Sequence, residues 1–400
     1  MMAAFAFSVS VAWWPGIAGA ALTPRWIIIA VGASSLLMLG ERLRFTFAHL
    51  WGSLFLGWCL LTWLWSASPD DTIGAGFRLV VLALVFCLGS LQRNMRPVYF
   101  GTAAGMAVCS VIASAQFWGW TGIPQDVVPA ALFVNRNFYA EFAALVAVAL
   151  IAERAWWWLP ATAPGLILTG ARGALLGLCV PLIWLWRRSW VGGVLLVAGI
   201  AAVLMVTFLT RAQWLDGYRA DLVFDRTTDI HVRLSYWRAT LDEITVTGAG
   251  LGSFYLAAPH PIEGLRADHP HNEFLELAFE TGLIGLGLFV IFIGSIMTAG
   301  TTTETLVLGA ALTEACFGFP FHEPATAFLG VLAAGGAAGR LRGICDPAGA
   351  GRADLCSGRA RAGDREEVST LPAGHGVLAI RSPAPHLGCG ASDPTKRTLR

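Results

Sequence analysis

The sequence carries little charge. Only 13% of its 400 residues are Asp, Glu, Lys or Arg, against about 25% in an ordinary soluble domain. Hydrophobic residues make up 56% of the chain, and apolar stretches long enough to cross a bilayer recur along most of it. A soluble protein with one large core fits this composition poorly, so we predict a polytopic membrane protein.

Other absences exclude further classes of protein. The long polar stretch at 210–273 contains no cysteine, so we expect no structural disulfide, and the chain has no CxxC metal motif. No basic, aromatic-rich segment suggests nucleic-acid binding, and we expect no cofactor and no metal. The N-terminal stretch lacks a charged start, and we interpret it as a first span rather than a cleaved signal peptide.

About twelve spans are predicted in an all-α bundle covering residues 1–340, since each span needs roughly 20 apolar residues. They lie near 4–22, 26–40, 46–66, 73–91, 98–118, 134–152, 155–170, 172–187, 190–209, 274–298, 304–319 and 324–339. Several are short, which leaves ten or eleven open. Residues 341–400 are rich in Gly, Ala, Pro and Arg, and we expect a disordered cytoplasmic tail there.

Arginines in short loops indicate the orientation. One set of alternate loops holds Arg42, Arg44, Arg93, Arg96, Arg154, Arg187 and Arg188. The opposite short loops hold Arg25, Arg136 and Arg172, with Asp70, Asp71 and Asp126 beside them. We expect the more basic side, and both termini, to be cytoplasmic. The large loop at 210–273, between the ninth and tenth spans, then lies in the periplasm.

Two segments of this loop have a recognisable pattern. In "RLSYWRATLDEI", Leu234, Trp237, Leu241 and Ile244 follow at spacings of 3, 4 and 3. This predicts an amphipathic helix that lies on the membrane or on the bundle. The Gly-rich segment "TGAGLGSF" follows, and we interpret it as a tight chain reversal. A nucleotide-binding loop is disfavoured because no strand precedes it and no GK[ST] follows.

The segment "HPHNEF" opens the predicted tenth span. Pro270 disfavours a helix before it and Asn272 is a good N-cap, so His271 should lie at the start of the helix. A helix N-terminus favours a neutral imidazole, which can accept a proton. Three roles for His271 compete: a surface histidine without function, part of a metal site with His269 and His260, or a general base.

Three carboxylates follow on one face of this helix, at Glu273, Glu276 and Glu280. Because charged groups are costly in lipid, this face should look into a wet cavity. Asp268 or one of the glutamates could orient His271. We favour the general base among the three roles, chiefly because of a resemblance in the surrounding sequence.

The stretch "HPHNEFLELAFETGLIGLGLFV" resembles the signature of the O-antigen ligase and polymerase superfamily, in which a His-Asn pair opens a span with a Gly-Leu-Ile-Gly run. Further segments are similar to family elements in the same order: "WSASPDDT", "NRNFYAEFAALVAV", "LTGARGALLGL" and "RLSYWRATLDEITVTGAGLGSF". Ala171 stands where serine is common. The resemblance covers roughly residues 60–340.

The resemblance implies a GT-C-like membrane enzyme of the bacterial inner membrane. Such an enzyme transfers a glycan from undecaprenyl diphosphate on the periplasmic face, without a nucleotide sugar or a metal. The diphosphate is already a good leaving group, so the reaction needs cations to hold it and a base for the acceptor hydroxyl. The simplest mechanism is a single displacement at the anomeric carbon with inversion.

Site residues are assigned by their position within the family pattern. His271 is the base, and Arg172 and Arg233 hold the diphosphate, with Arg136 as a weaker third cation. Interfacial snorkelling is the alternative for Arg172 and Arg136, and a salt bridge to a nearby carboxylate is the alternative for Arg233. The other substrate-binding candidates are Asn137, Asn272, Glu276 and His269.

The acceptor stays open at this stage. It is lipid A-core for a ligase, a growing glycan for a polymerase, and Ser or Thr for a protein O-oligosaccharyltransferase. We favour a ligase or polymerase, because no additional outer domain is present to hold a protein acceptor. The alternative from another class is a lipid or polysaccharide transporter, which predicts ionisable residues deep in several spans. The expected partners are the lipid-linked glycan, its acceptor and membrane lipids, with no nucleic acid.

Overall fold

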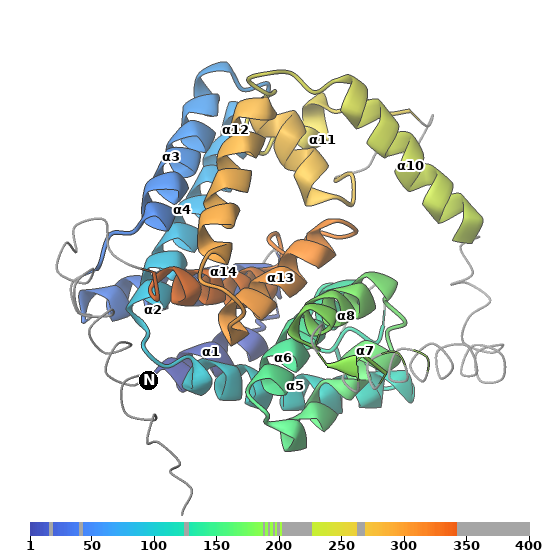
Figure 1. The fold of residues 1–400 in the computed structure, drawn as a ribbon. Coiled ribbons are helices and arrows are strands. Elements are labelled where there is room, and N and C mark those ends of the chain that lie inside the picture. The colour runs from blue at the N-terminus through green and yellow to red at the C-terminus, as the bar shows by residue number, and fades with distance from the viewer. Residues whose placement is uncertain are drawn as a thin grey trace, which may run out of the picture. The chain divides into compact units, whose positions relative to one another are not determined.

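The computed structural model is all-helical over the residues it describes, as the sequence predicts (Figure 1). These residues are 1–15, 19–39, 43–123, 128–186, 189–190, 193–194, 197, 201, 226–261 and 269–341, with backbone only at 226–231. Most of the predicted ninth span, and the predicted tail from residue 342, lie outside this set. Neither prediction is tested.

The helices follow one another along the first 341 residues. The α-helices are α1 Met2–Val11, α2 Leu22–Met38, α3 Phe47–Leu61, α4 Pro69–Leu91, α5 Arg96–Phe117, α6 Arg136–Ala152, α7 Ala163–Ile167, α8 Arg172–Trp186, α10 Arg226–Asp242, α11 Phe254–Ala257, α12 Glu273–Met297, α13 Thr303–Ala315 and α14 Pro324–Ala338. Two 3₁₀ turns, η1 Thr62–Trp65 and η2 Trp156–Ala161, complete the described set.

Most helix ends lie close to the predicted span ends, because the sequence supplies local start signals. Proline stands in the first turn of α4, α5 and α14, where its missing N–H costs nothing. Asn135 caps α6 and Asn272 caps α12 with their side chains. The predicted span at 155–170 is wrong: η2 and the five-residue α7 divide this stretch, with Pro160 inside η2 and Pro164 in the first turn of α7.

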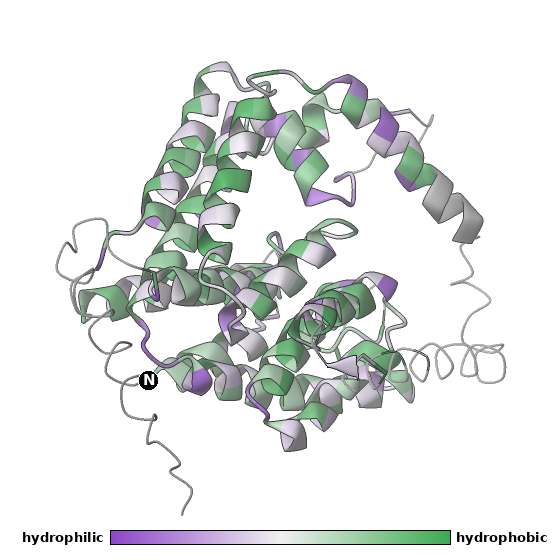
Figure 2. Cartoon of the chain, viewed as in Figure 1, coloured by the Kyte–Doolittle hydropathy of each residue, from purple (hydrophilic) through white to green (hydrophobic). Residues whose placement is uncertain are grey.

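Four of the described helical stretches are long and apolar enough to cross a membrane. They are Phe47–Trp65, Pro69–Leu91, Arg96–Phe117 and Glu273–Met297. Figure 2 shows hydrophobic residues along much of α3, α4 and α12, and hydrophilic residues on α10 and at the start of α12. A membrane protein is therefore supported, whereas a count of about twelve spans stays a prediction.

Small residues let helices of the bundle approach each other closely. A Cβ added at Gly89 of α4 would collide with the carbonyl oxygen of Leu332 in α14. A Cβ at Gly335 of α14 would likewise collide with the carbonyl oxygen of Phe86 in α4. Such backbone-to-backbone packing through glycine is typical of helices associating in a membrane.

A buried ion pair joins the N-terminal and C-terminal helices. Arg25, which we expected in a short loop, lies in the first turn of α2 and is fully buried. Its Nη1 donates to Oε1 of Glu323 at 2.8 Å. Its other N–H groups donate to the carbonyl oxygens of Val9, Ser10 and Leu132. Because these hydrogen bonds hold the guanidinium in one position, the guanidinium in turn holds the side chain of Glu323, which caps α14.

Candidate active site

The start of α12 has the geometry that its sequence predicts. The Asn272 side chain accepts hydrogen bonds from the backbone N–H groups of Phe274 and Leu275, both at 3.1 Å. His271 precedes this cap with a φ of 55°, in the left-handed region that non-glycine residues adopt infrequently. Its side chain is partly buried. The cap and the turn together hold the imidazole at the N-terminal mouth of α12.

Helix α10 contacts the same turn. Trp237 donates its indole N–H to the carbonyl oxygen of Pro270 at 2.7 Å. Among the described side chains of α10, Tyr236 and Thr240 are buried, whereas Leu234 and Leu241 of the apolar stripe are exposed. The helix is therefore confirmed, and whether its apolar stripe lies on the membrane stays a prediction. The exposed leucines leave an apolar face free for contact with lipid.

The Gly-rich segment after α10 packs against a kink in α12. Gly282 has φ 71° and ψ −178°, which interrupts the helical hydrogen-bond ladder. The segment supplies the missing partners: Ala249 N donates to Phe279 O at 3.0 Å, and Leu283 N donates to Thr245 O at 3.1 Å. Gly248 has a positive φ of 79°. The segment is thus a chain reversal, as the sequence suggests, and it stabilises the part of α12 around Gly282.

Much of the site is assembled on the loop between α13 and α14, residues 316–323, here called the α13–α14 loop. Phe319 lies at its centre. The ring centroids of His269 and His271 are 5.1 and 5.0 Å from that of Phe319. Phe138 of α6 packs on the same ring, with centroids 5.3 Å apart. One aromatic side chain therefore brings together the start of α12 and the start of α6.

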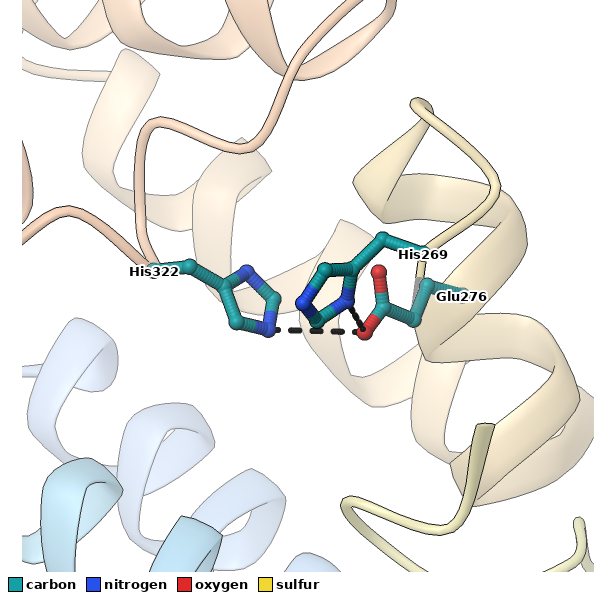
Figure 3. A group of neighbouring side chains, drawn as sticks. All are labelled: His269, Glu276 and His322. Atoms are coloured by element: carbon teal, nitrogen blue, oxygen red, sulfur yellow. Dashed lines mark hydrogen bonds and ion pairs between the residues drawn. The ribbon is translucent and has the colours of Figure 1, made fainter. Parts of the chain in front are cut away.

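Two histidines and two glutamates form a compact group beside Phe319. Figure 3 shows three of them, His269, Glu276 and His322. His269 Nδ1 lies 2.8 Å from Glu276 Oε1, and His322 Nε2 lies 3.4 Å from the same oxygen. On its other side, His322 Nδ1 lies 3.0 Å from Oε1 of Glu273. The backbone N–H of Phe321 also donates to this Glu273 oxygen, at 2.9 Å. The group is thus shared by the start of α12 and the α13–α14 loop.

The charge state of His322 follows from this arrangement. Burial by itself would lower the pKa of His322, because it penalises the charged ring. The charge of Glu276 and the hydrogen bonds with Glu273 and Glu276 outweigh burial and raise the pKa of His322 well above its ordinary value. The raised pKa therefore favours the protonated, positively charged form of the His322 ring at neutral pH.

The predicted cations approach the same loop from other helices. Arg233 of α10 donates from Nη1 to the carbonyl oxygen of Phe317 at 3.0 Å. Arg172 is exposed at the first position of α8. A Cβ on its neighbour Gly173 would lie 3.7 Å from the Cβ of Phe317. Both arginines therefore lie near Phe317.

The start of α6 contributes the remaining predicted residues. Arg136 is partly buried at the first position of α6, and the exposed Asn137 follows it. The backbone N–H of Asn137 donates to Oδ1 of Asn135 at 2.8 Å. Asn135 is thus the structural residue of this Asn-rich entry, and the Asn137 side chain has no part in the cap. Phe138, next in the chain, makes the link to Phe319.

A cavity of about 370 Å³ opens beside the histidine–glutamate group. Its lining includes the polar residues His269, Glu273, Glu276, Glu280 and His322. The glutamates of α12 therefore do line a cavity, but most of its lining is apolar, so the predicted wet character is not shown. Most of the remaining lining is apolar and comes largely from α3, α4 and α12, including Phe55, Leu82, Phe86, Phe289 and Phe292.

The sequence analysis missed His322 and Phe319. His322 lies about 50 residues from the glutamates of α12, and a hydrogen bond across such a separation produces no periodic pattern in the sequence. A signal was nevertheless present in "FGFPFHEP", where a histidine and a glutamate stand between two apolar helices beside prolines. This is the same kind of polar patch at a helix entrance that drew attention to His271.

Comparison with known proteins supports the resemblance predicted from the sequence. A family model described as O-antigen ligase matches residues 158–290. The matched region includes α8, α10, the Gly-rich segment and most of α12, and hence Arg172, Arg233 and His271. No curated protein matches the chain.

Proposed function

We propose that the chain transfers a glycan from undecaprenyl diphosphate to an acceptor hydroxyl, a proposal supported by the O-antigen ligase family model that matches residues 158–290. The reaction takes place on the periplasmic face of the bacterial inner membrane. The observation that carries the proposal is that the family match contains the predicted base and both principal cations, and the fold brings their segments to the α13–α14 loop.

Arg172 and Arg233 hold the diphosphate in this proposal. Guanidinium groups bind phosphate oxygens in pairs and stay charged at any physiological pH. They stabilise the negative charge that grows on the leaving diphosphate as the glycosidic bond breaks. The position of both residues near Phe317 supports a shared role. Arg136, at the start of α6, is the third proposed cation; its neighbour Phe138 packs on Phe319.

His271 is the proposed base for the acceptor hydroxyl. It accepts the hydroxyl proton while the oxygen attacks the anomeric carbon, and the diphosphate leaves from the opposite face, which inverts the configuration. The Phe319 ring, 5.0 Å away between centroids, restricts the orientation of the imidazole. Four further residues are proposed to contact the sugar. His269, Asn272 and Glu276 lie at or just before the start of α12, and Asn137 lies at the start of α6.

The apolar part of the cavity suits the lipid portion of the donor. Its phenylalanines and leucines come from helices that have membrane-spanning length, and its volume of about 370 Å³ lies in the range of ligand pockets, about 300–1,000 Å³. An isoprenoid chain can enter it from the bilayer, while the diphosphate lies outside the cavity at Arg172 and Arg233, which do not line it. The acceptor is lipid A-core or a growing glycan; a protein hydroxyl is the alternative.

A transporter of lipid or polysaccharide is the second candidate, and one observation favours it. Glu141 of α6 and Glu314 of α13 are buried, and Glu141 Oε2 and both Glu314 carboxylate oxygens have no hydrogen-bond partner. Buried acidic residues of this kind are frequent in proton-coupled carriers. Both residues lie outside the matched region, residues 158–290, so we place this function second.

The test is a gel profile of surface polysaccharide in a strain that lacks the protein. The strain receives wild type, His271→Ala or His260→Ala, with membrane levels matched by immunoblot. His260 is an exposed histidine before α12 and serves as the control. We expect wild type and His260→Ala to restore the long-chain ladder and His271→Ala to fail. Full restoration by His271→Ala would refute the base, and a ladder unchanged by deletion would refute glycan transfer.

A further inference from the structure

His269, Glu276 and His322 are arranged as a set of metal ligands. Each offers one ligand atom, and the three atoms lie within 4.8 Å of one another (Figure 3). Two imidazoles and one carboxylate are a donor set that proteins use for Zn²⁺ and other divalent first-row metals. The sequence analysis considered a different set, with His271 and His260, but His260 is exposed and the structure brings His322 to His269 instead.

The hydrogen bonds of the group leave some of its polar atoms unsatisfied. The Nδ1 of His322 is engaged by Glu273, so its Nε2 points at Glu276 Oε1 from 3.4 Å, a long and weak contact. The second oxygens of Glu273 and Glu276 are buried and have no hydrogen-bond partner. Two unpartnered carboxylate oxygens beside two imidazole rings are costly, and they mark a place where a cation would be stabilised.

The distances also suit a metal ion. Tetrahedral Zn²⁺ with bonds near 2.0–2.2 Å places its ligand atoms about 3.4 Å apart. The pair formed by His322 Nε2 and Glu276 Oε1 has this separation, 3.4 Å. The pair formed by His269 Nδ1 and the same oxygen, at 2.8 Å, must open by about 0.6 Å. Because His269 lies in the turn before α12, a small rotation of its side chain is enough.

Glu273 completes the arrangement as an outer carboxylate. A metal-binding histidine almost always donates its other ring N–H to a carboxylate or carbonyl, which fixes the tautomer and the ring orientation. Glu273 Oε1 lies 3.0 Å from His322 Nδ1 and is itself held by the Phe321 N–H. The Nε2 lone pair of His322 is thereby directed toward Glu276, where a metal would lie.

We propose that His269, Glu276 and His322 form a divalent metal site of the Zn²⁺ type, with Glu273 as the residue that orients His322. Binding requires that the ring nitrogen of each histidine facing the metal carry no proton, so the affinity for the metal should fall as the pH is lowered. The same three residues line the cavity, so the fourth coordination position is left for an oxygen atom of water or of a molecule that enters it. Metal binding does not depend on glycan transfer, and the two are measured separately.

The test uses the full-length protein, purified in detergent, treated with a chelator and then freed of it. Zn²⁺ is titrated by calorimetry, and bound zinc is measured after gel filtration. We expect wild type to retain one equivalent. His322→Ala and His269→Ala should lose it, and Glu273→Gln should weaken binding about 10- to 100-fold. His260→Ala, which removes an exposed histidine from the same outer region, should bind like wild type.

Two outcomes overturn the proposal. Wild-type protein that takes up no saturable equivalent of Zn²⁺ excludes the site, whatever the variants do. Equal binding by wild type, His322→Ala and His269→Ala means that zinc is held adventitiously elsewhere. Loading with Co²⁺ separates these cases further, since the proposed site predicts the intense visible bands of a four-coordinate ion and surface binding predicts a weak six-coordinate spectrum. A loss of the ladder without loss of zinc, or the reverse, distinguishes this site from the transfer reaction.

Discussion

Substituting Gly282 by alanine should destabilise the protein strongly, because this glycine makes the kink of α12. Its φ of 71° and ψ of −178° belong to a region that is essentially confined to glycine, and a residue forced into it costs about 1–3 kcal/mol. An added Cβ would also collide with backbone atoms of Val246 and Thr247. These atoms belong to main chain and cannot rotate away.

Relieving that collision separates the Gly-rich segment from α12. The hydrogen bonds from Leu283 N to Thr245 O and from Ile284 N to Val246 O would be lost. Each contributes about 0.5–1.5 kcal/mol. Together with the backbone cost, the free energy of unfolding should fall by about 2–6 kcal/mol, a large part of the stability of a typical domain.

The assay is thermal unfolding of the purified protein in detergent, with Gly287→Ala as the control. Gly287 lies in the same helix, and a Cβ there would meet no atom within 4 Å. Alanine at that position should be neutral or stabilise the helix by up to about 1 kcal/mol, because it restricts the unfolded chain. Equal melting temperatures for Gly282→Ala and Gly287→Ala would refute this account of the kink.

Three further substitutions test other parts of the structure. Arg25→Met leaves a buried carboxylate without its partner and should lower the free energy of unfolding by about 3–5 kcal/mol. Arg96→Met breaks an exposed ion pair and should change the free energy of unfolding by at most about 1 kcal/mol. Similar losses for the two variants would contradict the argument from burial. Trp237→Phe removes the hydrogen bond to Pro270 and should weaken glycan transfer more than stability; full transfer activity would show that α10 does not position the turn. The pKa of His322 is raised in the folded protein. In the presence of a chelator, its contribution to the free energy of unfolding is therefore complete below the unfolded pKa, near 6.5, and is lost as the pH rises through the folded pKa. Melting curves of His322→Gln should lack this loss, and a pH dependence equal to that of wild type would argue against the ion pair.

The positions of most helices could be predicted from the sequence because their signals are local. Asn272 and Asn135 act as caps through hydrogen bonds that span only two or three residues. The stretch at 155–170 shows the limit of such reasoning, because its apolar composition suits a span while Pro160 and Pro164 divide it. Hydropathy measures whether a segment tolerates lipid, but it does not measure whether the segment is one helix.

The site could be predicted only in part, for a related reason. His271 and the glutamates of α12 are neighbours in the sequence, so their shared helix entrance could be inferred from spacing. The contact of His322 with Glu276 depends on how the α13–α14 loop folds back on α12, which no local pattern encodes. The packing of α10 is a similar case: Tyr236 is buried and Leu234 is exposed, and apolar spacing alone does not show which side of a helix faces the rest of the protein.

The pair of Arg25 and Glu323 has a consequence for how the protein is made. Its two members are 298 residues apart in the chain, and at a synthesis rate of about 5–20 residues per second the ribosome needs about 15–60 s to travel between them. During that interval the Arg25 guanidinium has main-chain carbonyls such as those of Val9 and Ser10 as hydrogen-bond acceptors, but not yet the carboxylate that balances its charge. A nascent chain that stops before residue 323 therefore carries an unbalanced positive charge in the first turn of α2, and we expect α2 to pack less stably in such a chain than in the finished protein.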